Sequence, residues 1–310
     1  MQRVFVVGCP RSGTTLVQAM LARHPDVYSL QETRLFEAVL GGVPARWEDL
    51  GAHRGRRWYH RAGLAQSWGR RRLRELENTY WPEKRHLPVP LRWGACARRY
   101  VALLDHAANA QSKSHWIEKT PNHLLFLDEM AECVPGARFV HVLRNGADVV
   151  ASVTDADLHH GTDAFRGGVA LWTARWNRAM KLHLARTRDS SHYLICLEDL
   201  IADPSAEWTR LCAFLDLDAH APLLVRPGSV VADCRREPWK RGALAGVVQP
   251  PARKSRDLFG PRILAWLDSH LTEYRGIRAA VESSHGIAMH RDEQRASRSG
   301  RSYRGRAVRH

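Results

Sequence analysis

Short apolar runs alternate with longer amphipathic segments along most of the chain. The run RVFVVG at residues 3–8 is rich in β-branched side chains, which is typical of a parallel strand buried on both faces. A helix is expected directly after it, because Leu16, Met20 and Leu21 lie on one helical face and Pro25 follows its end. This alternation of strand and helix predicts an α/β domain.

Four further strands are expected from short apolar runs. They are VYSL (27–30), HWIEK (115–119), ARFVHVLR (137–144) and HYLICL (192–197). Helices are expected at about 32–40, 94–110, 121–134 and 147–153, around Trp172 and Trp176, at 205–217 and last at 259–274, with a loop over 226–256. Strands separated by helices predict a three-layer parallel sheet flanked by helices, with ligands bound beyond the carboxyl ends of the strands.

A chain of 310 residues with 44% hydrophobic content is long enough to bury the core of an enzyme. We expect one main domain over residues 1–290, with a helical insertion or acceptor lid at 45–113. Residues 291–310 form a basic tail, which we interpret as disordered because it has little apolar content to pack. A nucleic-acid or membrane tether is the alternative interpretation of this tail.

The formal net charge of +15 favours an anionic partner, such as a nucleotide, a nucleic acid, a membrane surface or a sulfated product. Residues 46–99 carry 14 Lys or Arg against 5 Asp or Glu, and residues 291–310 carry 7 Arg against 2 acids. These two stretches therefore hold 14 of the 15 net charges.

The insertion also contains five tryptophans, Trp47, Trp58, Trp68, Trp81 and Trp93. Together with Arg34 they are candidates for recognition of an acceptor, because aromatic rings stack on a ring or sugar and arginines attract an anion. A solvated helical face with the tryptophans packed inward explains the same pattern equally well.

Neither a metal site, a disulfide framework nor a membrane span is predicted. The six cysteines contain no C-x-x-C pair, and the adjacent His159 and His160 lack the ligand spacing of a helical metal site. There is no apolar run of 18 residues, and the N-terminus enters a strand directly instead of a signal sequence. A reducing cytoplasm is the default expectation, and a homo-oligomer stays open.

The stretch GCPRSGTT at residues 8–15 is typical of a phosphate-binding loop. Two glycines five residues apart, followed by a helix, let successive N–H groups and the positive end of the helix dipole face an anion. A nucleoside-triphosphate loop carries a lysine after the second glycine, whereas Thr14 and Thr15 stand here and the positive charge lies at Arg11.

Polar residues also follow the other predicted strands: Glu32 after the second, Lys119 at the end of the third and Arg144 at the end of the fourth. Singly, each has a structural explanation, as a helix-starting acid, a surface charge or an ion-pair partner. Together with the loop, their repeated placement at strand ends predicts a site.

The motifs PRSGTT and LRNGADVVAS resemble the two nucleotide-binding motifs of sulfotransferases that use 3′-phosphoadenosine-5′-phosphosulfate (PAPS). GCPRSGTTLVQAMLARHPDVYSLQETR is similar to the opening of the tyrosylprotein sulfotransferases, and EKTPNHLLFL, LEDLIADP and LCAFLDL to segments of the bacterial branch. The likeness covers roughly residues 3–217.

This resemblance implies a role for each matching position. Ser12, Gly13 and the two threonines would hold the 5′-phosphosulfate with Arg11, and Arg144 and Ser152 would hold the 3′-phosphate. Glu32 of ETR would be the catalytic base, while Lys119 of KTP and Arg11 would stabilise the leaving group, adenosine 3′,5′-bisphosphate. No metal is required, and the acceptor would be a hydroxyl of a phenol, carbohydrate, secondary metabolite or peptide.

The contacts to the adenine are less defined. Leu197 stands where many relatives have a tyrosine before EDL. Trp172 and Trp176 are candidates for the nucleotide side, although their spacing favours core packing. Arg241 or Lys254 would supply a late basic contact to the cofactor.

Two other functions remain as alternatives. An ATP-dependent kinase would share the glycine loop, but it should have the lysine and a strand-end carboxylate for Mg²⁺, for which Asp199 is the candidate. A non-catalytic basic nucleic-acid-binding protein would instead use the tail; we consider nucleic acid the less favoured partner.

Overall fold

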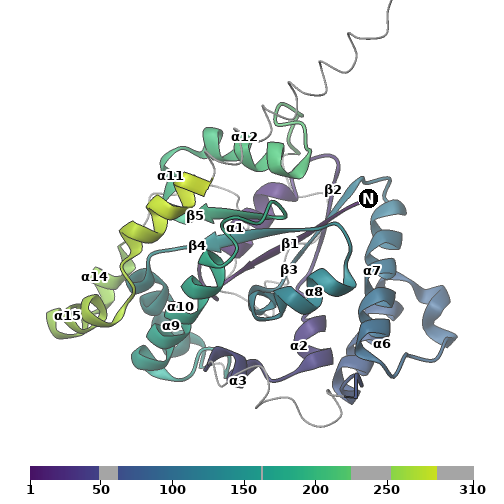
Figure 1. The fold of residues 1–310 in the computed structure, drawn as a ribbon, viewed down its shortest axis with the longest axis horizontal. Coiled ribbons are helices and arrows are strands. Elements are labelled where there is room, and N and C mark those ends of the chain that lie inside the picture. Colours follow the sequence, from purple (N-terminus) through teal and green to yellow (C-terminus); the bar gives the residue numbers. More distant parts are fainter. Residues whose placement is uncertain (49–61, 162, 225–252, 285–310) are drawn as a thin grey trace, which may run out of the picture.

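The computed structural model describes residues 1–48, 62–161, 163–224 and 253–284. At its centre lies a five-stranded sheet with the strand order β2-β3-β1-β4-β5 (Figure 1). All neighbouring strands are parallel. The strands are β1 (Gln2–Gly8), β2 (Val27–Leu30), β3 (His115–Lys119), β4 (Ala137–Leu143) and β5 (His192–Cys196). The predicted parallel α/β sheet is therefore confirmed.

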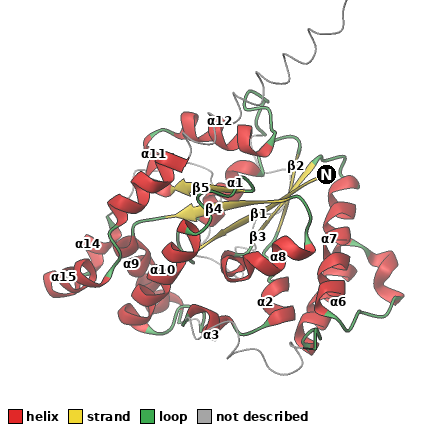
Figure 2. Cartoon of the chain, in the orientation of Figure 1, coloured by secondary structure: helices red, strands yellow, loops and turns green. Residues whose placement is uncertain are grey.

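Helices lie on both sides of the strands (Figure 2). They are α1 (Thr14–Leu21), α2 (Leu35–Leu40), α3 (Val43–Trp47), α6 (Ser67–Tyr80), α7 (Trp93–Asn109), α8 (Leu127–Cys133), α9 (Gly146–His160), α10 (Gly168–Leu184), α11 (Leu197–Ala202), α12 (Pro204–Leu215), α14 (Lys254–Leu258) and α15 (Pro261–His270). Two 3₁₀ helices, η1 (Pro82–His86) and η2 (Pro121–Phe126), interrupt this series, and residues 274–284 are also helical.

Some predicted helix boundaries were wrong. The helix expected from residue 32 begins only at Leu35, because Arg34 adopts a left-handed backbone with φ of 53° and residues 31–34 have no regular structure. The helix at 259–274 is not the last one, since a further helix spans 274–284. The loop expected over 226–256 lies mostly outside the described residues, and its last residues belong to α14.

The side chains of β1 alternate between two apolar layers, one on each face of the sheet. Phe5 and Val7 pack in a cluster with side chains of α2, α6, α7, α8 and α10. Val4 and Val6 pack on the opposite face with side chains of α1, α11 and α12. Because successive strand residues point to opposite faces, the continuous apolar run of β1 is explained by burial on both sides.

The predicted insertion contributes to this same core. Leu73 of α6 and Tyr100 of α7 belong to the cluster that contains Phe5. The division into a domain at 1–290 and an insertion at 45–113 stays a prediction, and the tail at 291–310 lies outside the described residues. Within the ranges described, none of the helices has both the length and the apolar character needed to cross a membrane.

Candidate active site

A cavity of about 480 Å³ lies beyond the carboxyl ends of the strands. The register of the sheet explains why distant segments meet there. Leu30 pairs with Glu118, so the chain leaving β2 lies beside the end of β3, and Val6 pairs with Lys119, so β3 lies in turn beside β1. Gly8 pairs with Val142, so the loop after β1 lies beside the end of β4.

Nine of the ten predicted site residues line this cavity. They are Arg11, Gly13, Thr14, Thr15, Glu32, Arg34, Lys119, Arg144 and Ser152. The structure does not bring Ser12 to the cavity wall: its side chain is fully buried, and its N–H closes the loop by donating to the carbonyl of Cys9 at 3.1 Å.

The phosphate-loop geometry follows from two residues with positive φ. Arg11 has φ of 72° and Gly13 has φ of 99°, and α1 starts directly afterwards at Thr14. The first N–H groups of a helix have no partner within it and form its electropositive end. Gly13, Thr14 and Thr15 at this end of α1 line the cavity, which suits an anionic ligand.

Arg11, Arg144 and Ser152 form one connected group. The Nε of Arg11 donates to the hydroxyl of Ser152 at 3.1 Å, and Nη1 of Arg144 donates to the carbonyl of Arg11 at 3.2 Å. Burial, together with the charge of Arg144, lowers the pKa of Arg11 to about 10 against the opposing effect of Asp155. Arg11 therefore stays charged near neutral pH, and two guanidinium groups face the same part of the cavity.

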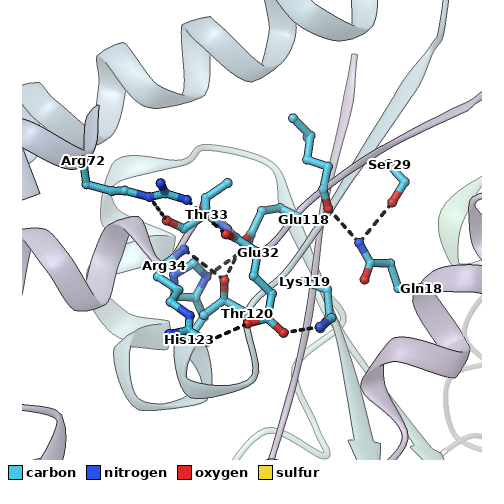
Figure 3. A network of polar contacts seen from close by, with 11 residues as sticks. Gln18, Ser29, Glu32, Thr33, Arg34, Arg72, Glu118, Lys119, Thr120 and His123 are labelled. Atoms are coloured by element: carbon cyan, nitrogen blue, oxygen red, sulfur yellow. Dashed lines mark hydrogen bonds and ion pairs between the residues drawn. The ribbon is translucent and has the colours of Figure 1, made fainter. Parts of the chain in front are cut away.

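Glu32 and Lys119, which also line the cavity, form an ion pair (Figure 3). The ammonium of Lys119 contacts Oε1 of Glu32, and Nη2 of Arg34 lies 3.4 Å from Oε2. The Lys119 side chain is fully buried, whereas 11% of the Glu32 side chain is exposed. The expectation that these strand-end residues come together is met, and the helix-starting role of Glu32 is excluded because α2 begins three residues later.

A buried carboxylate, Glu118, lies behind this ion pair (Figure 3). Its Oε1 accepts hydrogen bonds from the Thr33 N–H at 2.9 Å, the Thr33 hydroxyl at 3.0 Å and the Thr120 hydroxyl at 2.6 Å. Burial alone would raise the pKa of the Glu118 carboxyl, but the charge and hydrogen bond of His123 and these donors outweigh it, so the pKa lies below its usual value. Glu118 is thus a fixed negative anchor for the segment that carries Glu32.

A known protein family matches most of the chain. A model of the sulfotransferase family matches residues 3–221. The chain belongs to the sulfotransferase family. The resemblance noted in its motifs is therefore confirmed.

Individual relatives are protein-tyrosine sulfotransferases by name. One from Drosophila melanogaster is 26% identical over 247 residues, covering 74% of this chain and 42% of the relative. Protein-tyrosine sulfotransferase 2 from Gallus gallus is 45% identical over 248 residues, covering 74% of this chain and 57% of the relative. The chain thus spans about half the length of these curated relatives.

A solved structure shares the fold. The sulfotransferase domain from the curacin biosynthetic pathway superposes with a TM-score of 0.50 at 17% identity, covering 87% of this chain and 99% of that one. The predicted fold class is confirmed by this likeness.

Several cavity residues of this sulfotransferase-family chain were not predicted from its sequence. They are Glu37, Val43, Asn122, Phe165 and Arg175, among others, whereas the candidates Trp47 and Trp172 line the cavity as well. Burial raises the pKa of the Glu37 carboxyl against the opposing charges of His123 and Arg34. Arg175 lies with its guanidinium carbon 4.8 Å from the Trp172 ring centroid. Asn122 lies next to the motif KTP, which gave the sequence signal for it. The other residues lie on helices or loops whose sequence has no recognisable pattern.

The two helical tryptophans have different surroundings. Trp176 is fully buried and its Nε1 donates to the carbonyl of Arg144 at 2.9 Å. Trp172 is 2% exposed and also lines the cavity. Core packing, the preferred interpretation, therefore holds for both, and Trp172 contributes in addition to the site. Leu197 packs against the phosphate loop, where it would lie 2.9 Å from a Cβ placed on Gly13.

Asp199 has a structural role. Its carboxylate pairs with Arg278 of the 274–284 helix, and it is not among the residues that line the cavity. Its neighbour Glu198 accepts the N–H of Asn145 at 2.9 Å and the hydroxyl of Tyr274 at 2.7 Å. The EDL segment thus anchors the turn after β4 to the 274–284 helix.

Two basic residues were candidates for a late contact to the cofactor. Lys254 pairs with Asp155 of α9, and Arg241 lies outside the described residues.

Proposed function

We propose that this protein transfers the sulfuryl group of PAPS to the hydroxyl of an acceptor. The observation that carries the proposal is the meeting, around one cavity, of the Glu32–Lys119 ion pair and the group formed by Arg11, Arg144 and Ser152. Family membership makes sulfuryl transfer the expected chemistry. The names of the relatives favour peptide tyrosine among the candidate acceptors, which also include phenols, carbohydrates and secondary metabolites.

The donor groups of the cavity suit the two anionic ends of PAPS. Thr14, Thr15 and the start of α1 would bind the 5′-phosphate through hydroxyl and N–H donors. Arg144 and Ser152 would bind the 3′-phosphate, because a guanidinium and a hydroxyl bond phosphate oxygens from different sides. The loop offers no lysine for a γ-phosphate.

In the proposed reaction the acceptor oxygen forms a bond to sulfur while the bond from sulfur to the bridging oxygen breaks. Glu32 takes the acceptor proton, and adenosine 3′,5′-bisphosphate leaves with the bonding electron pair. Arg11 and Lys119 would stabilise the negative charge that develops on the leaving oxygen. Sulfuryl transfer depends mainly on in-line positioning and charge stabilisation, as phosphoryl transfer does.

Glu37 is a second carboxyl that faces the cavity. We assign the base to Glu32 because it contacts the buried Lys119, one of the two groups proposed to stabilise the leaving oxygen. Glu37 of α2 is the alternative base, because its side chain is also a carboxyl group that can accept a proton.

The proposal is tested by an acceptor screen with PAPS labelled in its sulfuryl group, run on the wild type and three variants. Glu32→Gln should lower kcat by about 10²- to 10⁴-fold, the usual contribution of a general base, with unchanged affinity for adenosine 3′,5′-bisphosphate. Arg144→Ala should weaken that affinity about 10- to 100-fold, because charge-assisted hydrogen bonds to a phosphate are lost. Glu37→Gln should retain most turnover.

Each alternative has its own outcome. Tight Mg²⁺-dependent binding of ATP, measured by calorimetry against the bisphosphate, would favour a kinase. Salt-sensitive binding of DNA or RNA that disappears when residues 291–310 are removed, without bisphosphate binding, would favour the nucleic-acid-binding alternative. Loss of turnover in Glu37→Gln but not in Glu32→Gln would move the base to Glu37.

A further inference from the structure

The segment that carries Glu32 has no secondary structure of its own. Residues 31–34 connect β2 to α2 without regular hydrogen bonding, and Arg34 adopts the left-handed φ of 53°. Side chains from other elements must therefore hold this segment in place, because an unsupported loop would not fix a catalytic group to within the fraction of an ångström that catalysis needs.

Glu118 and Thr120 hold the segment on its inner side. The N–H of Thr33 donates to Glu118 and the N–H of Arg34 donates to the Thr120 hydroxyl at 3.2 Å. The Thr33 hydroxyl lies 2.7 Å from the hydroxyl of the fully buried Tyr100. The N–H groups of Thr33 and Arg34 thus donate to side chains at the end of β3, and the carbonyls of Glu32 and Thr33 accept hydrogen bonds from elsewhere.

Arg72 of α6 supplies those partners from the outer side (Figure 3). Its Nε donates to the carbonyl of Thr33 at 2.8 Å and its Nη2 donates to the carbonyl of Glu32 at 3.3 Å. Nη1 of the same guanidinium contacts Glu75, one helical turn away, at 3.1 Å. The planar fork of one arginine thus bridges two consecutive carbonyls and is itself held by a carboxylate.

We propose that Arg72 is a positioning residue for Glu32, so that a helix of the predicted insertion fixes the geometry of the catalytic base. The inference rests on the proposed function, and it deepens it. Arg72 does not line the cavity, so it acts through the backbone of residues 32 and 33 and touches neither PAPS nor acceptor. Glu118 and Arg72 then hold the segment between them, one through N–H groups and the other through carbonyls.

Arg71 provides a matched control. It lies on the same helix, its side chain is 70% exposed, and its Nε lies 3.8 Å from the same Glu75. Arg71→Ala and Arg72→Ala therefore remove the same charge and a contact to the same carboxylate. They differ in the bonds to the Glu32 and Thr33 carbonyls.

The experiment compares sulfuryl transfer from PAPS to phenol and to 4-nitrophenol by the wild type, Arg71→Ala, Arg72→Ala and Glu32→Gln. Phenol must lose its proton during transfer, whereas 4-nitrophenol ionises readily near neutral pH and depends little on a base. We expect Arg72→Ala to lower kcat for phenol about 10- to 100-fold, with a clearly smaller loss for 4-nitrophenol and less than a twofold change in bisphosphate affinity. Arg71→Ala should resemble the wild type.

Hydrogen exchange gives a reading that does not depend on the acceptor. The amides of Thr33 and Arg34 should exchange at least tenfold faster in Arg72→Ala than in Arg71→Ala, with the core strands unchanged. Equal exchange in the two variants, or an equal kcat loss for both phenols, would overturn the positioning role.

The same measurements separate failure of the proposed function from failure of this inference. If the wild type transfers no sulfuryl group to any acceptor, the proposed function itself fails. If Glu32→Gln is impaired and Arg72→Ala is not, the function stands and the positioning role of Arg72 fails.

Discussion

Backbone strain is concentrated at the proposed site. Within the described residues, four residues other than glycine have positive φ: Arg11, Arg34, Ser112 and Asp216. Two of these, Arg11 and Arg34, line the cavity. Such conformations persist only where surrounding structure holds them, and they gather at functional sites. The motifs identify both arginines as candidate site residues. Their left-handed backbone depends on the phosphate-binding loop and on the contacts that hold residues 31–34, and sequence periodicity shows neither.

Gly13 offers a test of the loop at the scale of one residue. A Cβ there would meet Leu197 at 2.9 Å, and the φ of 99° is rarely adopted by other residues. Gly13→Ala should therefore lower the free energy of unfolding by about 1–3 kcal/mol and weaken bisphosphate binding by at least tenfold, because the loop must shift.

Gly136→Ala separates the two effects. Gly136 has a φ of 72°, but nothing lies within 4 Å of its added Cβ, and it is not among the residues that line the cavity. Denaturant unfolding should show a smaller loss of stability in this variant, and calorimetry should show unchanged bisphosphate affinity. An equal loss of affinity in both variants would contradict the role assigned to the loop.

The start of α9 links element stability to the proposed 3′-phosphate side of the site. The Asn145 side chain caps this helix by accepting the N–H of Asp148 at 3.3 Å, directly after Arg144. Asn145→Ala should destabilise the fold by about 1 kcal/mol, the usual contribution of such a cap, and should also weaken bisphosphate binding, because Arg144 and Ser152 lie on either side of this turn.

Asp203 at the start of α12 is the matching cap away from the cavity. Its carboxylate accepts the N–H of Ala206 at 3.0 Å. Asp203→Ala should lose similar stability, measured by urea unfolding, with no change in bisphosphate affinity. If Asn145→Ala also leaves the affinity unchanged, the turn after β4 does not position the 3′-phosphate site.

Elements with strong periodicity could be predicted from the sequence, whereas elements fixed by tertiary contacts could not. The five strands are short apolar runs bounded by turn residues, and each was found close to its expected place. The helix α11 was missed because it follows β5 without a connecting turn. The 274–284 helix is anchored by Tyr274 and Arg278 to the acidic pair Glu198 and Asp199, contacts between segments that no local pattern reveals.

The candidate site shows the same division. The strand-end rule and the family motifs located nine cavity residues, because parallel strands bring their carboxyl ends together whatever the loops do. They missed Arg72 and Glu118, which act through hydrogen bonds to backbone, and Arg175, which reaches the cavity from the middle of α10. Such roles depend on the packing of one helix against a loop, and a single sequence carries no periodic signal for them.

At the scale of the whole molecule, a chain of three histidines crosses the core between β4, α10 and β5. Nδ1 of His141 lies 2.8 Å from Nδ1 of His183, and Nε2 of His141 lies 2.7 Å from Nδ1 of His192. His141 and His183 are fully buried. Burial lowers the pKa of His183 to about 3 and that of His192 to about 4, the latter against the opposing charge of Asp189.

The pKa of His141 also lies well below its usual value, through burial and then the charges of His183 and His192. His183 and His192 are therefore neutral in the folded protein at pH 5 to 7. In the unfolded chain each recovers a pKa near 6.5, so the unfolded state binds more protons as the pH falls. The stability is thus fully present above about pH 6.5 and declines as the pH falls from there toward the folded pKa values near 4 and 3.

This linkage predicts acid sensitivity of the entire fold. Between pH 6 and 5 His183 and His192 should each lower the free energy of unfolding by up to about 1.4 kcal/mol per pH unit, as measured by urea unfolding at a series of pH values. His183→Gln should flatten this slope by roughly half of the contribution of these two histidines, because glutamine keeps a hydrogen-bonding side chain but does not titrate. The raised pKa of Glu37 acts in the opposite direction, so the difference between the variant and the wild type is the diagnostic quantity. The same slope in both proteins would show that the buried histidine chain does not couple protonation to unfolding.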